Sequence, residues 1–114
     1  MKPKKVKLTI KVFKTWADYR LQIFSDYNID ALYLGNGVYL HKSVDIGPIF
    51  LPGWWALSVD CGLMILIVKG LKEEALRIGK LLTELDWAGI EKPAPKEYKE
   101  LAEKIAKNNS ACIF

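Results

Sequence analysis

The first fourteen residues alternate between apolar and polar side chains, a pattern typical of a β-strand with one buried face. The apolar positions are Val6, Leu8, Ile10 and Val12. The opposite face carries Lys5, Lys7 and Lys11 and reaches Phe13, and the whole segment holds six lysines and no acidic residue. We therefore expect a strand with one side in the core and, on the other, a row of positive charge that ends in an aromatic ring.

This lysine row has two interpretations. Proteins that bind single-stranded nucleic acid combine cations for the phosphates with rings on which bases stack. Lysines on an edge strand also prevent pairing with strands of other molecules. The chain has a net charge of +4, so the residues after the first fourteen are slightly acidic in sum. Such localised positive charge attracts polyanions and favours the first interpretation.

Length and composition indicate one domain, because 114 residues with 51% apolar composition can bury a single modest core. The longest apolar run, Leu63 to Val68, is too short to span a bilayer, and no signal peptide is visible. Two cysteines and one histidine lack the spacing of a zinc site. We expect a cytoplasmic protein without metal or cofactor.

Two segments follow the first strand. Thr15 with Asp18 resembles a capping box and predicts a helix through about Asp26, with Trp16, Tyr19 and Ile23 on one stripe. Next, the run 35–37 predicts a tight hairpin turn between strands 31–34 and 38–44. If all three turn residues lie in the loop, Leu34 faces Val38 and Leu32 faces Leu40. The opposite side then carries Tyr33, Tyr39 and His41.

The segment Pro48 to Gly53 reads as a loop with large apolar side chains, including Phe50, and these need a partner or a ligand. Trp54 and Trp55 follow at the start of the next strand. Neighbouring strand residues point to opposite faces, so one indole at most enters the core. We expect the other on the side of the lysines and tyrosines, or at its rim.

The second half of the chain predicts an apolar hairpin and two helices. Strands 54–59 and 63–68 surround a turn at 60–62, and the second strand has no polar position, so it needs cover on both faces. Helices 71–86 and 95–107 can cover one face, and a second copy of the chain is the simplest cover for the other. The apolar tail 111–114 should dock on the fold or on a neighbour. The expected fold is a single α+β domain, an antiparallel sheet of four or five strands with helices on one face.

In order and character these elements resemble the Thermo-DBP group of archaeal single-stranded DNA-binding proteins, particularly its shorter related members from hyperthermophiles, over roughly Lys5 to Trp87. The resemblance implies a basic, aromatic-lined cleft in a homo-oligomer, a dimer or tetramer. The founding members join two subunits through a longer C-terminal helix, whereas here a proline break, a short helix and an apolar tail take its place.

The residues together predict sequence-tolerant binding of single-stranded DNA, with RNA as an alternative. The expected contact residues are Lys5, Lys7, Lys11, Phe13, Tyr33, Tyr39, His41, Phe50, Trp54 and Trp55. No nucleophile and base stand at a recognisable spacing, so we do not expect an enzyme. The alternative is a protein-interaction or regulatory module that uses the apolar loop 48–53 and the apolar strand 63–68.

Overall fold

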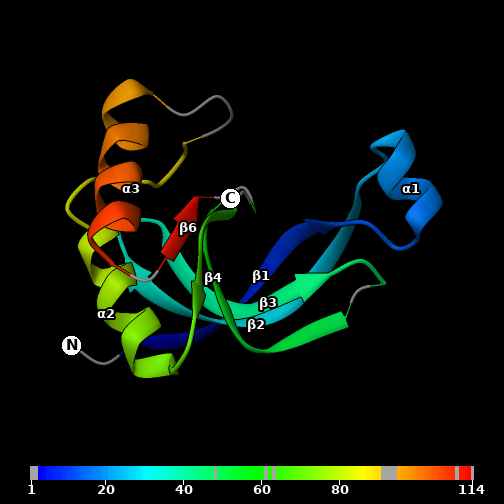
Figure 1. Cartoon of the computed structure of the whole chain (residues 1–114), viewed down its shortest axis with the longest axis horizontal. Helices are drawn as coiled ribbons and strands as arrows, with labels where there is room; N and C mark the ends of the chain where they lie inside the picture. Colours follow the sequence, from blue (N-terminus) through cyan, green and yellow to red (C-terminus); the bar gives the residue numbers. More distant parts are fainter. Residues whose placement is uncertain are drawn as a thin grey trace.

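Six antiparallel strands pair in the order in which they occur in the sequence. The computed structural model describes residues 3–47, 49–60, 62, 64–90, 95–109 and 111–113. The strands are β1 (Lys4–Val12), β2 (Ser25–Gly35), β3 (Val38–Asp45), β4 (Ile49–Val59), β5 (Met64–Lys69) and β6 (Ala111–Ile113). The described helices are α1 (Trp16–Leu21), α2 (Lys72–Leu82) and α3 (Lys96–Asn108). α2 and α3 lie at one end of the molecule and α1 projects from the other (Figure 1). None of these helices is long and apolar enough to cross a membrane.

The predicted α+β class is confirmed, but the sheet has six strands rather than four or five. The additional strand is β6, which the apolar tail forms by pairing with β5, so that Cys112 lies opposite Ile67. Residues 111–113 of the tail therefore dock on their own fold. Part of the expected loop 48–53 also belongs to the sheet, because β4 starts at Ile49 and pairs with β3 across a register irregularity. Pro48 itself lies outside the described residues, as do Cys61 and Leu63 of the second hairpin.

Helix boundaries follow local capping chemistry. The predicted cap is confirmed at α1, where the Asp18 backbone N–H donates to the Thr15 hydroxyl at 3.0 Å. α1 is shorter than expected because Gln22 adopts a left-handed conformation, with φ 56°, and ends it. β2 then begins at Ser25, opposite Val12. α2 also ends before the predicted residue 86, whereas α3 agrees with prediction within one residue.

The β2–β3 hairpin confirms most of the predicted register. Tyr33 faces Tyr39 and Leu32 faces Leu40, but Val38 faces Gly35 rather than Leu34, because the register shifts between residues 33 and 35. The turn itself contains two residues, Asn36 and Gly37, both with positive φ. A Cβ on Gly37 would lie 2.7 Å from the Ala88 Cα, so glycine allows the segment after α2 to pass close by.

Two hydrophobic clusters occupy opposite faces of the curved sheet. The cluster on the helix side contains, among others, Leu40, Leu57, Leu66, Ile78, Leu82 and Trp87. The cluster on the opposite side contains Leu8, Ile10, Val12, Ile29 and Ala31, with Tyr27, Tyr39, Val44 and Val6 packed against it. The sheet curls over this second cluster and brings the β4–β5 turn close to β1. The close approach is seen at Gly62, where an added Cβ would lie 2.6 Å from the Thr9 carbonyl oxygen. The apolar face of β1 is thus buried as predicted, but on the side away from α2 and α3.

Candidate nucleic-acid interface

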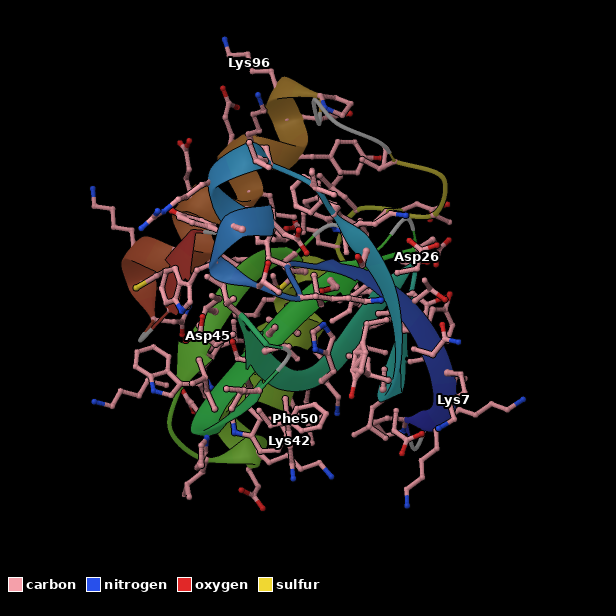
Figure 2. The ribbon with its side chains drawn as sticks, turned by 90° about the vertical axis from the view of Figure 1, so that its right-hand side faces the viewer. Lys7, Asp26, Lys42, Asp45, Phe50 and Lys96 are labelled. Atoms are coloured by element: carbon pink, nitrogen blue, oxygen red, sulfur yellow. The ribbon has the colours of Figure 1, made fainter. Side chains whose placement is uncertain are left out.

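The β1 lysine row, defined as Lys5, Lys7 and Lys11, lies on the helix side of the sheet, since Lys5 is directly opposite Leu32. Lys7 forms an ion pair with Asp30, and Lys11 forms one with Asp26. The hydrogen bond and charge of Lys7 hold the pKa of Asp30 below its ordinary value. Lys7 and Asp26 lie along the same margin of the molecule in Figure 2. Cross-strand carboxylates therefore neutralise two of the three lysines. The sequence pattern of β1 alone does not predict these ion pairs.

The predicted tyrosine side is separate from that row. Tyr33 and Tyr39 lie on the opposite face, with ring centroids 5.0 Å apart. Burial and the neighbouring Asp60 carboxylate raise the pKa of Tyr39 to about 12. The Tyr33 hydroxyl accepts a hydrogen bond from the Gly37 N–H at 3.1 Å. The expectation of a single face for lysines and tyrosines is therefore wrong: β1 turns its apolar side, not its lysines, toward the tyrosines.

His41 shares the tyrosine face but is only 2% exposed. Its Nδ1 lies 2.8 Å from the Lys42 carbonyl oxygen, which can only accept, so in the neutral ring Nδ1 carries the proton. Nε2 then accepts from the Ser58 hydroxyl at 2.8 Å. Burial lowers the pKa of His41 from its ordinary value. The pair is a neutral core element that a ligand cannot reach as placed. No sequence pattern indicates this pair, because its partners lie on neighbouring strands.

The two neighbouring tryptophans lie on opposite faces, as strand alternation predicts. Trp55 packs against the helix-side core, and its indole N–H donates to the Gly70 carbonyl oxygen at 3.1 Å. Trp54 lies on the other face, directly opposite Lys69. The Lys69 Nζ is 5.5 Å from the centroid of the Trp54 ring. Because both indoles are half-buried, Trp54 keeps part of its ring accessible beside a cation.

We define the tryptophan–lysine surface as the end of the sheet that carries Trp54 and Lys69 on one face and Trp55 and Lys42 on the helix face, together with Lys72. Lys42 lies opposite Trp55 on the helix side, and Lys72 is the first residue of α2. Among the described residues none of the three lysines is within ion-pair distance of a carboxylate. From residue 46 to residue 72 the one acidic residue is Asp60, at the far end of β4, although Glu73 follows Lys72 directly. This end of the sheet therefore combines indoles with unpaired cations.

Phe50 and Phe13, the two remaining predicted contact residues, lie elsewhere. Phe50 is about half exposed and lies opposite Val44 of β3. Figure 2 shows it near Lys42 in that view. Phe13 is half-buried directly after β1, with the Phe24 ring 4.5 Å and the Tyr19 ring 5.3 Å away between centroids. Phe13 thus lies beneath a second group of aromatic and apolar side chains around α1, away from the tryptophans.

That second group, which we call the α1 surface, consists of exposed side chains around α1. Its members are Trp16, Tyr19, Leu21, Ile23, Phe24 and Ile49. The Trp16 and Tyr19 rings are 5.9 Å apart between centroids, and no residue of α1 is buried. The Gly47 N–H donates to the Phe13 carbonyl oxygen at 3.0 Å and brings the turn that precedes Ile49 to this group. The sequence predicted the stripe of α1 but not its exposure.

No three His, Cys, Asp or Glu side chains of the described part of the chain come together in a way that could hold a metal ion. Comparison with models of protein families, with curated proteins and with solved structures gave no match. The two aromatic surfaces are therefore the candidate binding sites among the described residues.

Proposed function

We propose that this protein binds single-stranded nucleic acid, DNA or RNA, with little sequence preference, and that Trp54 is the ring on which a base stacks. The observation that supports this most directly is the Lys69 ammonium group above the accessible Trp54 ring. A stacking ring beside a mobile cation suits a base together with its own phosphate.

The magnitudes favour exchange of the ammonium for a base. An exposed cation–π contact contributes about 0.5–1 kcal/mol. Stacking of one base on an aromatic side chain contributes about 1–3 kcal/mol. A base can therefore displace Lys69 from the ring, and the released ammonium is free to bind a phosphate. Lys72, at the start of α2, extends the path for the backbone, and Lys42 lies at the same end of the sheet on its helix face.

The direct test is a titration with labelled oligonucleotides, single-stranded and duplex, at two salt concentrations. Single strands should bind well ahead of duplex, because paired bases are not available to stack. Affinity should fall as salt rises, because each neutralised phosphate releases counterions. Part of the tryptophan fluorescence should be quenched on binding. Equal affinity for duplex would contradict stacking, and absence of binding to either would end the proposal.

The alternative of a protein-interaction module draws support from other residues. The apolar strand 63–68 offers little free surface where it is described, because Leu66 and Val68 are buried and β4 and β6 pair with both edges of β5. Ile49 and Phe50 of the apolar segment 48–53 are exposed, and Ile49 is a member of the α1 surface. A protein partner therefore fits the α1 end better than the strand 63–68.

A further inference from the structure

The α1 surface exposes more apolar area than an ordinary solvent-facing region. Leu21 is 69% exposed, Trp16 66% and Ile49 61%, and the other three members are about half exposed. Taking roughly 200 Å² for each large side chain, the six expose on the order of 600 Å². Specific interfaces bury upward of about 600 Å² on each partner, so this surface alone is large enough for a stable contact.

The α1 helix itself indicates that something covers it. It contains six residues, and none of them is buried. Helices this short are not stable without tertiary packing of their apolar side. The rings of Phe13, Tyr19 and Phe24 pack on one another, but Trp16 and Leu21 extend beyond them into solvent. A covering partner would supply the missing packing.

Charge at the border of the surface selects among partners. Asp18 and Arg20 stand on the same short helix, and Lys14 precedes it. A polyanion or an acidic protein would be repelled by Asp18, and a basic protein would be repelled by Lys14 and Arg20. A copy related by two-fold symmetry presents the same patch in the reverse direction, so that acidic groups of one copy can face basic groups of the other.

We propose that the α1 surface binds the α1 surface of a second copy and forms a two-fold symmetric dimer. The arrangement leaves the tryptophan–lysine surface open, because Lys69 leads into α2 and α1 projects from the opposite end of the molecule (Figure 1). The dimer would therefore present two separate nucleic-acid sites. The dimer itself does not depend on nucleic-acid binding.

The test is the mass of the protein, measured by light scattering and sedimentation over a range of micromolar concentrations without oligonucleotide. The parent should show twice the monomer mass of 13.0 kDa. Leu21→Glu and, separately, Trp16→Glu should raise the dimer dissociation constant by a factor of about 100 or more, because each buries an unpaired charge. Leu71→Glu is the matched control, since Leu71 is equally exposed, at 74%, but lies outside the surface.

The outcomes separate the possible occupants. A dimer that is lost in both α1 variants and kept in the control supports the proposal, provided that each variant shows the circular dichroism of a folded chain and a cooperative thermal transition. The midpoint should be lower in the monomeric variants, because dimerisation stabilises the folded state. A parent that remains monomeric at every concentration overturns it and leaves the surface to another protein. A dimer that persists in both α1 variants overturns it in favour of a different contact between copies.

Discussion

The tryptophan–lysine surface and the α1 surface both expose aromatic rings, but their surroundings differ. Trp54 has an ammonium group above its ring and unpaired lysines nearby. Trp16 packs edge-on against Tyr19 and belongs to a group of exposed apolar side chains, with Asp18, Arg20 and Lys14 of both charge signs nearby in the sequence. Apolar patches with few central charges are typical of protein interfaces, whereas nucleic acid requires cations. Charge rather than aromatic content thus distinguishes the two surfaces.

A similar contrast separates the lysines of the β1 row from those around Trp54. Both groups hold three lysines, but Asp26 and Asp30 lie directly across from Lys11 and Lys7 in β2. A phosphate at β1 would have to compete with these carboxylates. At the end of β4 and β5 no ion pair of the described residues has to be broken.

The largest effect should come from removing the lysines around the tryptophans. Replacing Lys42, Lys69 and Lys72 together by Ala should weaken single-strand binding by up to about 3 kcal/mol, at roughly 1 kcal/mol at most for each exposed charge pair. The slope of log affinity against log salt should become shallower by about 2, at roughly 0.7 for each phosphate. Fluorescence anisotropy at several salt concentrations measures both quantities.

The matched comparison is the triple replacement of Lys5, Lys7 and Lys11 by Ala. Because two of these lysines are already paired, this variant should lose less affinity and retain most of the salt slope. If it instead loses more than the variant at residues 42, 69 and 72, the phosphate path follows β1 and our assignment is wrong.

The next effect concerns the rings themselves. Trp54→Ala should cost roughly 1–3 kcal/mol of oligonucleotide binding and remove most of the fluorescence quenching, because a stacking platform is lost. Trp16→Ala, the control at the other surface, should bind like the parent. Trp55→Ala should instead lower the free energy of unfolding by roughly 2–4 kcal/mol, less than a fully buried aromatic, because its indole is half-buried in the helix-side core. A loss of oligonucleotide binding in Trp16→Ala, with none in Trp54→Ala, would mean that the α1 surface binds the nucleic acid and the tryptophan–lysine surface does not.

A smaller effect should appear in the pH dependence of stability. Burial lowers the pKa of His41 in the folded state, so below about pH 6.5 the unfolded chain binds more protons than the folded one. The stability contributed by neutral His41 is therefore complete above that pH and is lost as the pH falls toward the folded pKa. Urea midpoints between pH 7.5 and 5 should decrease in the parent and decrease less in His41→Gln.

Binding should not share this pH dependence. If His41 contacted a phosphate, affinity would rise as the ring gained a proton below pH 6.5. Because the ring is buried against Ser58, we expect affinity to stay level through this range wherever the protein remains folded. A rise in affinity that is abolished in His41→Gln would place the histidine at the ligand after all.

Much of the fold could be predicted because its signals are local. The alternation in β1, the turn at Asn36 and Gly37, and α3 depend on neighbouring residues, and each is found near its predicted position. The opposite orientation of Trp54 and Trp55 follows from strand geometry alone. The tail strand β6 was missed because three residues carry no pattern of their own and acquire a structure only by pairing with β5.

The candidate site was less predictable because it depends on pairing between strands distant in sequence. Lys7 and Lys11 have the same spacing as Asp26 and Asp30, so an antiparallel register that matches one pair also matches the other. The sequence hides this match, because its pattern predicts a helix through residue 26 and because the β1–β2 connection contains α1 instead of a tight turn. The contact between Lys69 and Trp54 likewise depends on a β4–β5 register that shifts between Leu57 and Ser58.

The smallest expected effect concerns Asp26 and Asp30, whose ion pairs should prevent the lysines of the β1 lysine row from binding phosphates. Replacing Asp26 and Asp30 together by Asn keeps the shape of both side chains, removes two negative charges and releases Lys11 and Lys7. Both aspartates are exposed, so thermal unfolding should change little. Single-strand affinity should rise a few-fold and the salt slope should steepen, because released lysines can bind phosphates.

The matched control replaces Asp45 and Asp86, two exposed aspartates outside β1 and β2, by Asn, and it should reproduce only the general effect of a more positive chain. An equal gain in both variants would mean that net charge alone attracts the oligonucleotide and that the cross-strand pairs do not control where it binds.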